Sequence, residues 1–186
     1  MLDKIISIDK NLLIYLNSLG SATFDPFWQL ITKQANWTPF FVLIFYILYQ
    51  KLGKTNFLYA IGFIALLILV CDQSANLFKH TFQRLRPCND PQINSIIRVV
   101  KQSSSYSFYS GHATNSMATT LFVYSILKKH YKNTPLLFLF PLIFAYSRIY
   151  LGLHFPGDIL TGYLFGAIYG TIAYQLFNKY ILKPSL

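Results

Sequence analysis

The stretch that decides the fold is Pro135–Asn178, which reads PLLFLFPLIFAYSRIYLGLHFPGDILTGYLFGAIYGTIAYQLFN. It consists of two apolar blocks separated by a short turn, Leu151–Pro156. Each block approaches the ~20 residues that an α-helix needs to cross a bilayer. The turn contains His154, with Arg148 shortly before it and Asp158 shortly after it. The stretch therefore predicts two membrane-spanning helices joined by a polar turn.

The composition of the whole chain is typical of a membrane protein. Of its 186 residues, 54% are hydrophobic and 12% are charged, which is about half the charged fraction of a soluble domain. Three more apolar blocks precede the hairpin, and no linker-like change in composition divides the chain. The predicted spanning segments are Asn36–Gln50, Phe57–Phe78, His112–Leu127, Pro135–Tyr150 and Gly157–Asn178. The predicted fold is all-α, a polytopic membrane helical bundle with about five spanning helices in a single domain, residues 1–186.

Residues 1–35 differ from the predicted transmembrane core, residues 36–186. Leu2–Leu19 and Phe24–Gln34 each mix Asp or Lys with Ile, Leu, Phe or Trp, as helices at a membrane interface do. We expect both segments to form interfacial amphipathic helices. A spanning role for Leu2–Leu19 stays open, because that segment is almost long enough to cross.

The distribution of the basic residues argues against nucleic acid as a partner. The formal net charge is +10, but the lysines cluster in short segments between apolar blocks, as they do in cytoplasmic loops. These clusters are Lys51 and Lys54, then Lys128, Lys129 and Lys132, then Lys179 and Lys183. If the chain crosses the membrane five times, the three lysine clusters lie on one membrane face. The loops Lys79–Gly111 and Leu151–Pro156 then lie on the other face. We expect an integral protein of the cytoplasmic (inner) membrane, with these two loops on the periplasmic or extracellular face.

A stripe of polar residues approaches that second face along Phe57–Phe78 and the residues after it. Its members recur at steps of four, three and four, so they lie on one side of a helix. They are Asp72, Asn76, Lys79 and Gln83, and the sequence Arg84-Leu85-Arg86-Pro87 follows them. Ionisable residues within a membrane segment are costly and indicate a functional site. By itself the stripe is also compatible with hydrogen bonds between helices, and the arginines with lipid-headgroup contacts.

The segment before the third predicted span is a candidate anion site. Ser110 can cap the helix, and Gly111 lets the backbone turn tightly before His112. The free N–H groups of the first helical turn then point outward, where they suit a phosphate. An ordinary cap followed by an interfacial histidine explains the same residues.

The turn of the hairpin is a candidate catalytic pair. Pro156 suits a first helical turn, which places Asp158 within reach of His154. A carboxylate bonded to one ring nitrogen fixes the tautomer and leaves the other nitrogen as a nucleophile or base. An ion pair that closes the hairpin is the simpler explanation, but it does not account for Arg148.

These segments bring several cations to one membrane face, together with two histidines, one carboxylate and a capped helix start. The candidate site residues are Lys79, Arg86, Ser110, Gly111, His112, Arg148, His154 and Asp158. Three fixed cations would repel a divalent metal ion, so we expect neither a metal site nor a cofactor. The same cations suit an anion with several oxygens, and the planar fork of arginine suits phosphate.

The same residues resemble the signature of the type 2 phosphatidic acid phosphatase superfamily, which also includes vanadium haloperoxidases. Three family motifs occur in the right order and spacing. Lys-x6-Arg-Pro is matched by Lys79, Arg86 and Pro87, Pro-Ser-Gly-His by Ser110, Gly111 and His112, and Ser-Arg-x5-His-x3-Asp by Ser147, Arg148, His154 and Asp158. Tyr109 stands where the family usually has proline, and we expect it to alter the wall of the pocket and the choice of substrate.

The resemblance implies a lipid phosphatase with a phosphohistidine intermediate. His154 would attack phosphorus with Asp158 orienting it, and His112 would protonate the leaving oxygen and then help to activate water. The residues implied to hold the phosphate oxygens are Lys79, Arg86, Ser110, Gly111 and Arg148. The implied mechanism requires no metal, and we expect no cofactor.

The implied substrate is a phosphorylated membrane lipid. Undecaprenyl diphosphate, lipid A, phosphatidylglycerol phosphate and phosphatidate are all used within the family. A phosphotransferase that passes phosphate from His154 to another lipid stays open, and so does a non-catalytic protein that binds anionic headgroups. The enzyme is favoured because binding alone does not need the pairing of His154 with Asp158. A haloperoxidase is not expected, because those members of the superfamily are soluble.

Overall fold

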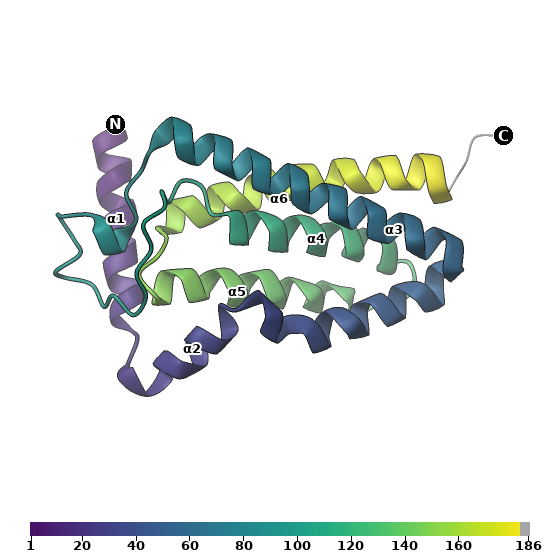
Figure 1. Ribbon diagram of the computed structural model, residues 1–186, viewed down its shortest axis with the longest axis horizontal. Coiled ribbons are helices and arrows are strands. Elements are labelled where there is room, and N and C mark those ends of the chain that lie inside the picture. Colours follow the sequence, from purple (N-terminus) through teal and green to yellow (C-terminus); the bar gives the residue numbers. More distant parts are fainter. Residues whose placement is uncertain (183–186) are drawn as a thin grey trace.

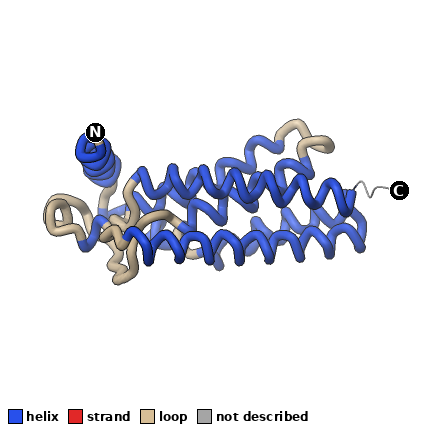
Figure 2. The backbone as a smooth tube through the Cα atoms, turned by 90° about the horizontal axis from the view of Figure 1, so that it is seen from above, coloured by secondary structure: helices blue, strands red, loops and turns tan. Residues whose placement is uncertain are grey.

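The computed structural model describes residues 1–182, and within them the chain forms helices and no strands (Figures 1 and 2). The predicted all-α class is therefore confirmed. The α-helices are α1 (Leu2–Ser18), α2 (Asp25–Ile31), α3 (Thr38–Phe82), α4 (Gly111–Leu127), α5 (Leu139–Tyr150) and α6 (Pro156–Phe177). The shorter helices are η1 (Ala22–Phe24), η2 (Gln34–Trp37), η3 (Pro87–Asn89), η4 (Thr134–Phe138) and η5 (Asn178–Leu182).

Helix α3 contains two of the predicted spans, because it breaks at Gly53. The φ of Gly53 is +70° and its ψ is 170°, a conformation that residues with a side chain rarely adopt. The chain reverses there, so that a first arm (residues 38–52) and a second arm (residues 54–82) run in opposite directions (Figure 1). The segment Gln34–Asn89 contains an 18-residue stretch that is apolar enough for a membrane helix, with a mean hydropathy of 2.0, and Thr134–Tyr150 is apolar but shorter. The number of crossings stays a prediction.

Helix α4 lies at the centre of the bundle and packs most extensively against α6, and then against α3 and α5. Three glycines four residues apart, Gly162, Gly166 and Gly170, face α4. A Cβ atom added to Gly166 would lie 2.6 Å from the carbonyl oxygen of Thr114. The small residues therefore let the two backbones approach closely, as is common between helices in membranes.

Helix α1 crosses one end of the bundle instead of running along it (Figures 1 and 2). Its side chains Ile5, Ile8 and Leu12 are exposed, which is the arrangement expected of an interfacial helix. The second predicted interfacial segment, Phe24–Gln34, is shorter than expected as a helix, because α2 covers only Asp25–Ile31. An interfacial location for both helices stays a prediction.

The lysine clusters lie at the opposite end of the bundle from α1. The turn at Gly53, the connection after α4 and the end of α6 all reach that end (Figure 1). Lys51 Nζ lies 5.1 Å from the ring centroid of Tyr131, which shows that the first two clusters are adjacent. Lys183 lies outside the described residues. The arrangement matches the expected grouping of the lysines on one face.

Candidate active site

His154 lies in the turn between α5 and α6. The backbone N–H groups of Leu153 and His154 both donate to the carbonyl of Arg148, over 2.9 and 3.3 Å. The N–H of Phe155 donates to Asp158 Oδ2 over 2.9 Å, so the carboxylate caps the start of α6. The same oxygen lies 3.4 Å from His154 Nδ1, and both side chains are buried. The geometry thus includes the predicted pairing of His154 with Asp158.

Arg86 occupies the other side of the imidazole. Its Nη1 lies 2.9 Å from His154 Nε2 and donates over the same distance to the carbonyl of Leu153, while its Nε donates over 2.8 Å to the carbonyl of Ser105. Because a guanidinium can only donate, Nε2 is the acceptor and the ring proton lies on Nδ1, facing Asp158. Burial, followed by the charge of Arg86, holds the pKa of His154 well below its usual range. The ring is therefore neutral, and the lone pair of Nε2 faces Arg86.

Two further cations border the same space. Arg148 is buried and its Nη1 donates to Thr32 Oγ1 over 2.6 Å, whereas its Nε has no hydrogen-bond partner within residues 1–182. Lys79 lies near the end of the second arm of α3, and a Cβ atom added to Gly111 would be 4.0 Å from its Nζ. Lys79 thus lies beside the start of α4, and Arg148 lies in the hairpin. The unpaired Nε of Arg148 suits an anion.

The start of α4 is fixed by Ser110. The side chain of Ser110 accepts from the N–H of Ala113 over 3.4 Å, and its own N–H donates to the carbonyl of Asp158 over 3.1 Å. The first of these contacts caps α4 and the second ties α4 to the hairpin. His112 follows in the first turn and stacks on Phe144, with ring centroids 5.2 Å apart.

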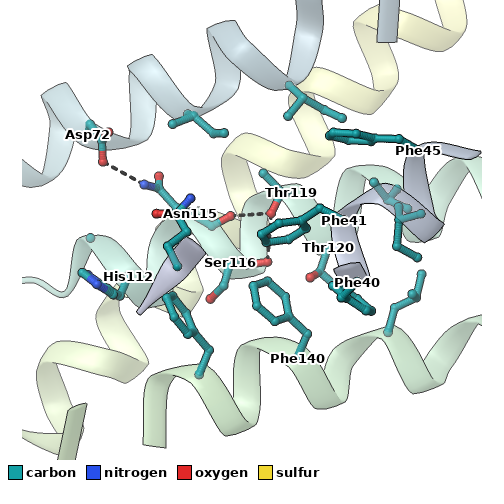
Figure 3. Close-up of a pocket in the computed structure, with 18 of the residues that line it drawn as sticks. Phe40, Phe41, Phe45, Asp72, His112, Asn115, Ser116, Thr119, Thr120 and Phe140 are labelled. Carbon is teal, nitrogen blue, oxygen red and sulfur yellow. Dashed lines mark hydrogen bonds between the residues drawn. The ribbon is translucent and has the colours of Figure 1, made fainter. Parts of the chain in front are cut away.

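A cleft of about 450 Å³ opens beside these residues, between the two arms of α3, α4 and α5. At one end its wall includes Lys79, Gly111 and His112, and deeper it is lined by apolar side chains such as Phe41 and Phe45 (Figure 3). The predicted residues that are buried beside the cleft are Arg86, Ser110, Arg148, His154 and Asp158. All eight candidate residues therefore gather at the end of the bundle that α1 crosses.

Two residues that hold this site were not predicted from the sequence, Arg84 and Asp9. Arg84 Nη1 donates to Asp158 Oδ1 over 2.8 Å, and its Nη2 donates to Asp9 Oδ2 over 2.7 Å. The guanidinium also lies 3.8 Å from the ring centroid of Phe155. Asp9, on α1, accepts from the N–H of Gly157 over 2.7 Å. Only the position of Arg84, two residues before Arg86, is a signal in the sequence, and a lipid-headgroup contact explains it equally well.

The expectation that Tyr109 alters the pocket wall is wrong. Its side chain is fully buried and stacks on Phe165, with centroids 4.9 Å apart. Its hydroxyl lies 2.6 Å from Ser74 Oγ. The ring therefore packs between α3 and α6 instead of entering the cleft. The reason is that the loop before α4 turns this side chain toward the aromatic residues of the neighbouring helices.

The polar stripe of α3 divides between the cleft and the surface. Asp72 and Lys79 line the cleft. Asn76 and Gln83 are exposed, and Gln83 ends the helix with a left-handed backbone, φ +47°. The interpretation of the stripe as part of a site therefore applies to two of its four members.

The comparisons with known proteins agree on one family. A profile of the PAP2 superfamily matches residues 53–182. The chain is 30% identical to a lipid A 4'-phosphatase of Porphyromonas gingivalis, over 95% of the chain and 75% of that protein. It is 31% identical to a lipid A 4'-phosphatase of Bacteroides thetaiotaomicron, over 96% of the chain and 81% of that protein. A transmembrane PAP2-type phosphatidylglycerolphosphate phosphatase from Bacillus subtilis has the same fold, with a TM-score of 0.74 and 20% identity over 97% of this chain and 90% of that one.

Proposed function

The chain belongs to the PAP2 superfamily and is a membrane-bound lipid phosphatase, and on that premise we propose that it removes phosphate from a lipid A-type glycolipid through a phosphohistidine at His154. The observation that carries the mechanism is the orientation of the imidazole. The carboxylate of Asp158 lies beside Nδ1 of His154, and the lone pair of Nε2 points toward Arg86. That is the form a histidine nucleophile needs.

The first step breaks the ester bond of the substrate. The phosphate oxygens take over the donors of Arg86, which uncovers Nε2 of His154. The lone pair of Nε2 forms a bond to phosphorus while the P–O bond to the lipid breaks. His112, which lies on the wall of the cleft, takes up a proton from solvent when the anionic phosphate binds beside it, and it gives this proton to the leaving oxygen.

The second step releases phosphate. Water attacks the phosphorus, its proton passes to His112, and the P–N bond breaks so that the electron pair returns to Nε2. The transition states of both steps carry charge on the equatorial oxygens. Groups around the cleft that donate to those oxygens are Lys79, Arg86, Arg148 and the first N–H groups of α4 after Ser110 and Gly111. Neither step needs a metal ion.

The choice of lipid rests on the cleft and on the relatives. The apolar depth of the cleft suits acyl chains. The two relatives from Porphyromonas gingivalis and Bacteroides thetaiotaomicron are lipid A 4'-phosphatases. The proposed site lies at the end of the bundle opposite the lysine clusters, so it faces the periplasm or the exterior if the lysines are cytoplasmic. We propose the inner membrane as its location.

Phosphate release by the detergent-purified protein tests the proposal. The substrates are lipid A, undecaprenyl diphosphate, phosphatidylglycerol phosphate and phosphatidate, each with EDTA present. We expect release from lipid A to be fastest, to be lost in His154→Ala, and to proceed through an acid-labile phosphorylated enzyme. Release by His154→Ala at the wild-type rate would refute the nucleophile. Phosphate found on a labelled acceptor lipid instead of in solution would assign a phosphotransferase.

A further inference from the structure

Polar side chains form one wall of the cleft beside His112. Four side chains on the second arm of α3 and on α4 form this wall, and we refer to them together as the acceptor patch. They are Asp72, Asn115, Ser116 and Thr119. Aromatic side chains lie across the cleft from them, among them Phe41 and Phe140 (Figure 3). Asp72 is exposed, Asn115 and Thr119 are half-buried and Ser116 is buried. A cleft that only held hydrocarbon would not need polar groups on this wall, because an acyl chain would cover them without bonding to them.

The hydrogen bonds of the patch use both hydroxyl donors and one N–H of the Asn115 amide, and leave acceptor oxygens free. Asn115 Nδ2 donates to Asp72 Oδ1 over 2.8 Å, and this contact fixes the amide, since a carboxylate can only accept. Asn115 Oδ1 is then buried without a partner among residues 1–182. The hydroxyl of Ser116 donates to the carbonyl of Ala113 over 3.1 Å, and that of Thr119 to the carbonyl of Asn115 over 2.7 Å. The patch thus offers lone pairs to a ligand.

The position of the patch defines which part of a substrate it meets. Asn115 follows His112 by one turn of α4 and Thr119 follows it by two turns, which corresponds to ~5 and ~10 Å along the helix. On α3, Asp72 precedes Lys79 by two turns. Because His112 protonates the leaving oxygen under the proposed function, the patch faces the leaving group within about two helical turns of that oxygen.

We propose that the acceptor patch is a recognition subsite for lipids that carry hydroxyl or amide N–H donors next to the scissile ester, as an acylated amino sugar does. This inference rests on the proposed function and refines its substrate class. A lipid without such donors would cover these acceptors and leave them unpaired, which disfavours its binding. Diacylglycerol offers only ester oxygens in this region, and a polyprenyl chain offers no polar atoms. A second phosphate placed here would be repelled by Asp72.

The ratio of kcat/KM on lipid A to kcat/KM on undecaprenyl diphosphate is the test. We expect Asp72→Leu to lower this ratio at least about 10-fold, as the loss of a hydrogen bond to a charged acceptor predicts. Activity on the donor-free lipid should stay the same or rise. Asn115→Leu removes the unpaired acceptor and should lower the ratio in the same direction. Gln73→Leu is the matched control, because Gln73 is exposed on the same turn of α3 and does not line the cleft.

Each outcome decides the matter. A selective loss on lipid A in both patch variants, with wild-type melting temperatures, supports the subsite. An equal loss on both lipids would indicate a general effect through Lys79 and would overturn it, as would an unchanged ratio or a wild-type preference for the donor-free lipid. If the wild type releases phosphate from neither lipid, the proposed function itself fails and the subsite fails with it. If Asp72→Leu does not fold, the comparison of Asn115→Leu with Gln73→Leu decides.

Discussion

Replacing Arg84 with alanine tests whether the buried pair of His154 and Asp158 depends on a cation outside the predicted motifs. Arg84 donates over 2.8 Å to Asp158 Oδ1 and is itself held by Asp9 over 2.7 Å. Asp158 is fully buried, so the alanine variant removes a charged donor that water cannot easily replace. We expect the carboxylate to reorient and the imidazole of His154 to lose its fixed direction.

The size of the effect follows from the exposure of the ion pair. A hydrogen bond to a charged group contributes about 1.5–3 kcal/mol. The side chain of Arg84 is 25% exposed while that of Asp158 is 0% exposed, and partial access to water favours the lower half of this range. A loss of about 2 kcal/mol corresponds to a fall in kcat of about 30-fold, at 1.36 kcal/mol for each factor of ten. Arg84 does not line the cleft, so KM should change little.

Phosphate release from one lipid substrate, measured with melting temperature, provides the assay. Arg84→Lys keeps a charge but not the two-pronged geometry, so we expect an intermediate loss. Asp9→Asn keeps an accepting oxygen and should cost less than Arg84→Ala. Lys101→Ala, which removes an exposed cation from the loop between α3 and α4, is the control and should retain kcat. Full kcat in Arg84→Ala at an unchanged melting temperature would refute the positioning role, and a rise in KM alone would assign Arg84 to substrate binding.

Three other measurements test the packing and the protonation of the site. Asn17→Ala removes the buried amide that bonds three carbonyls and one N–H, so we expect a loss of about 2 kcal/mol of stability, read as a lower melting temperature; an unchanged melting temperature would contradict this. Gly166→Ala should destabilise by ~1–3 kcal/mol, because the new Cβ would meet backbone at 2.6 Å, whereas Gly62→Ala, with nothing within 4 Å, should be neutral or stabilising. Burial and the neighbouring cations lower the pKa of His154 below 6.5, so the neutral nucleophile is lost only at lower pH. The yield of phosphoenzyme should therefore not fall as pH drops from about 8 to 6.5. A decline centred near pH 6.5 would count against His154 as the nucleophile.

Local sequence patterns predicted most of the fold because they follow from short-range physics. The apolar blocks had the length of helices, and the hairpin of α5 and α6 appeared with nearly its predicted ends. The position of Pro156 at the start of a helix was enough to predict the contact of His154 with Asp158, because it places the first-turn carboxylate next to the residues just before the helix. Likewise the cap by Ser110 follows from the residue types around it. Features that depend on a few neighbouring residues could therefore be predicted from the sequence.

Contacts between distant segments were not predictable in this way. Arg84 and Asp9 are separated by 75 residues, and no periodicity links them. The sequence suggested an interfacial α1, but nothing in it indicated which carboxylate of α1 would face the hairpin. Tyr109 was misplaced for a similar reason, because its direction depends on Phe165 on α6. The cleft also could not be derived, since it is the space that four separately predicted helices leave between them.

The contacts of the N-terminal segment with the hairpin suggest that α1 is more than a membrane anchor. The last turn of α5 has carbonyl groups without partners inside the helix, and Asn17 of α1 donates to those of Ile149 and Tyr150. Asp9 accepts from the N–H of Gly157 at the start of α6 and also holds Arg84. A polar turn next to hydrocarbon must have its backbone groups satisfied by protein. The polar face of α1 supplies those partners, so the helix that lies across the bundle also fixes the turn in which His154 is held.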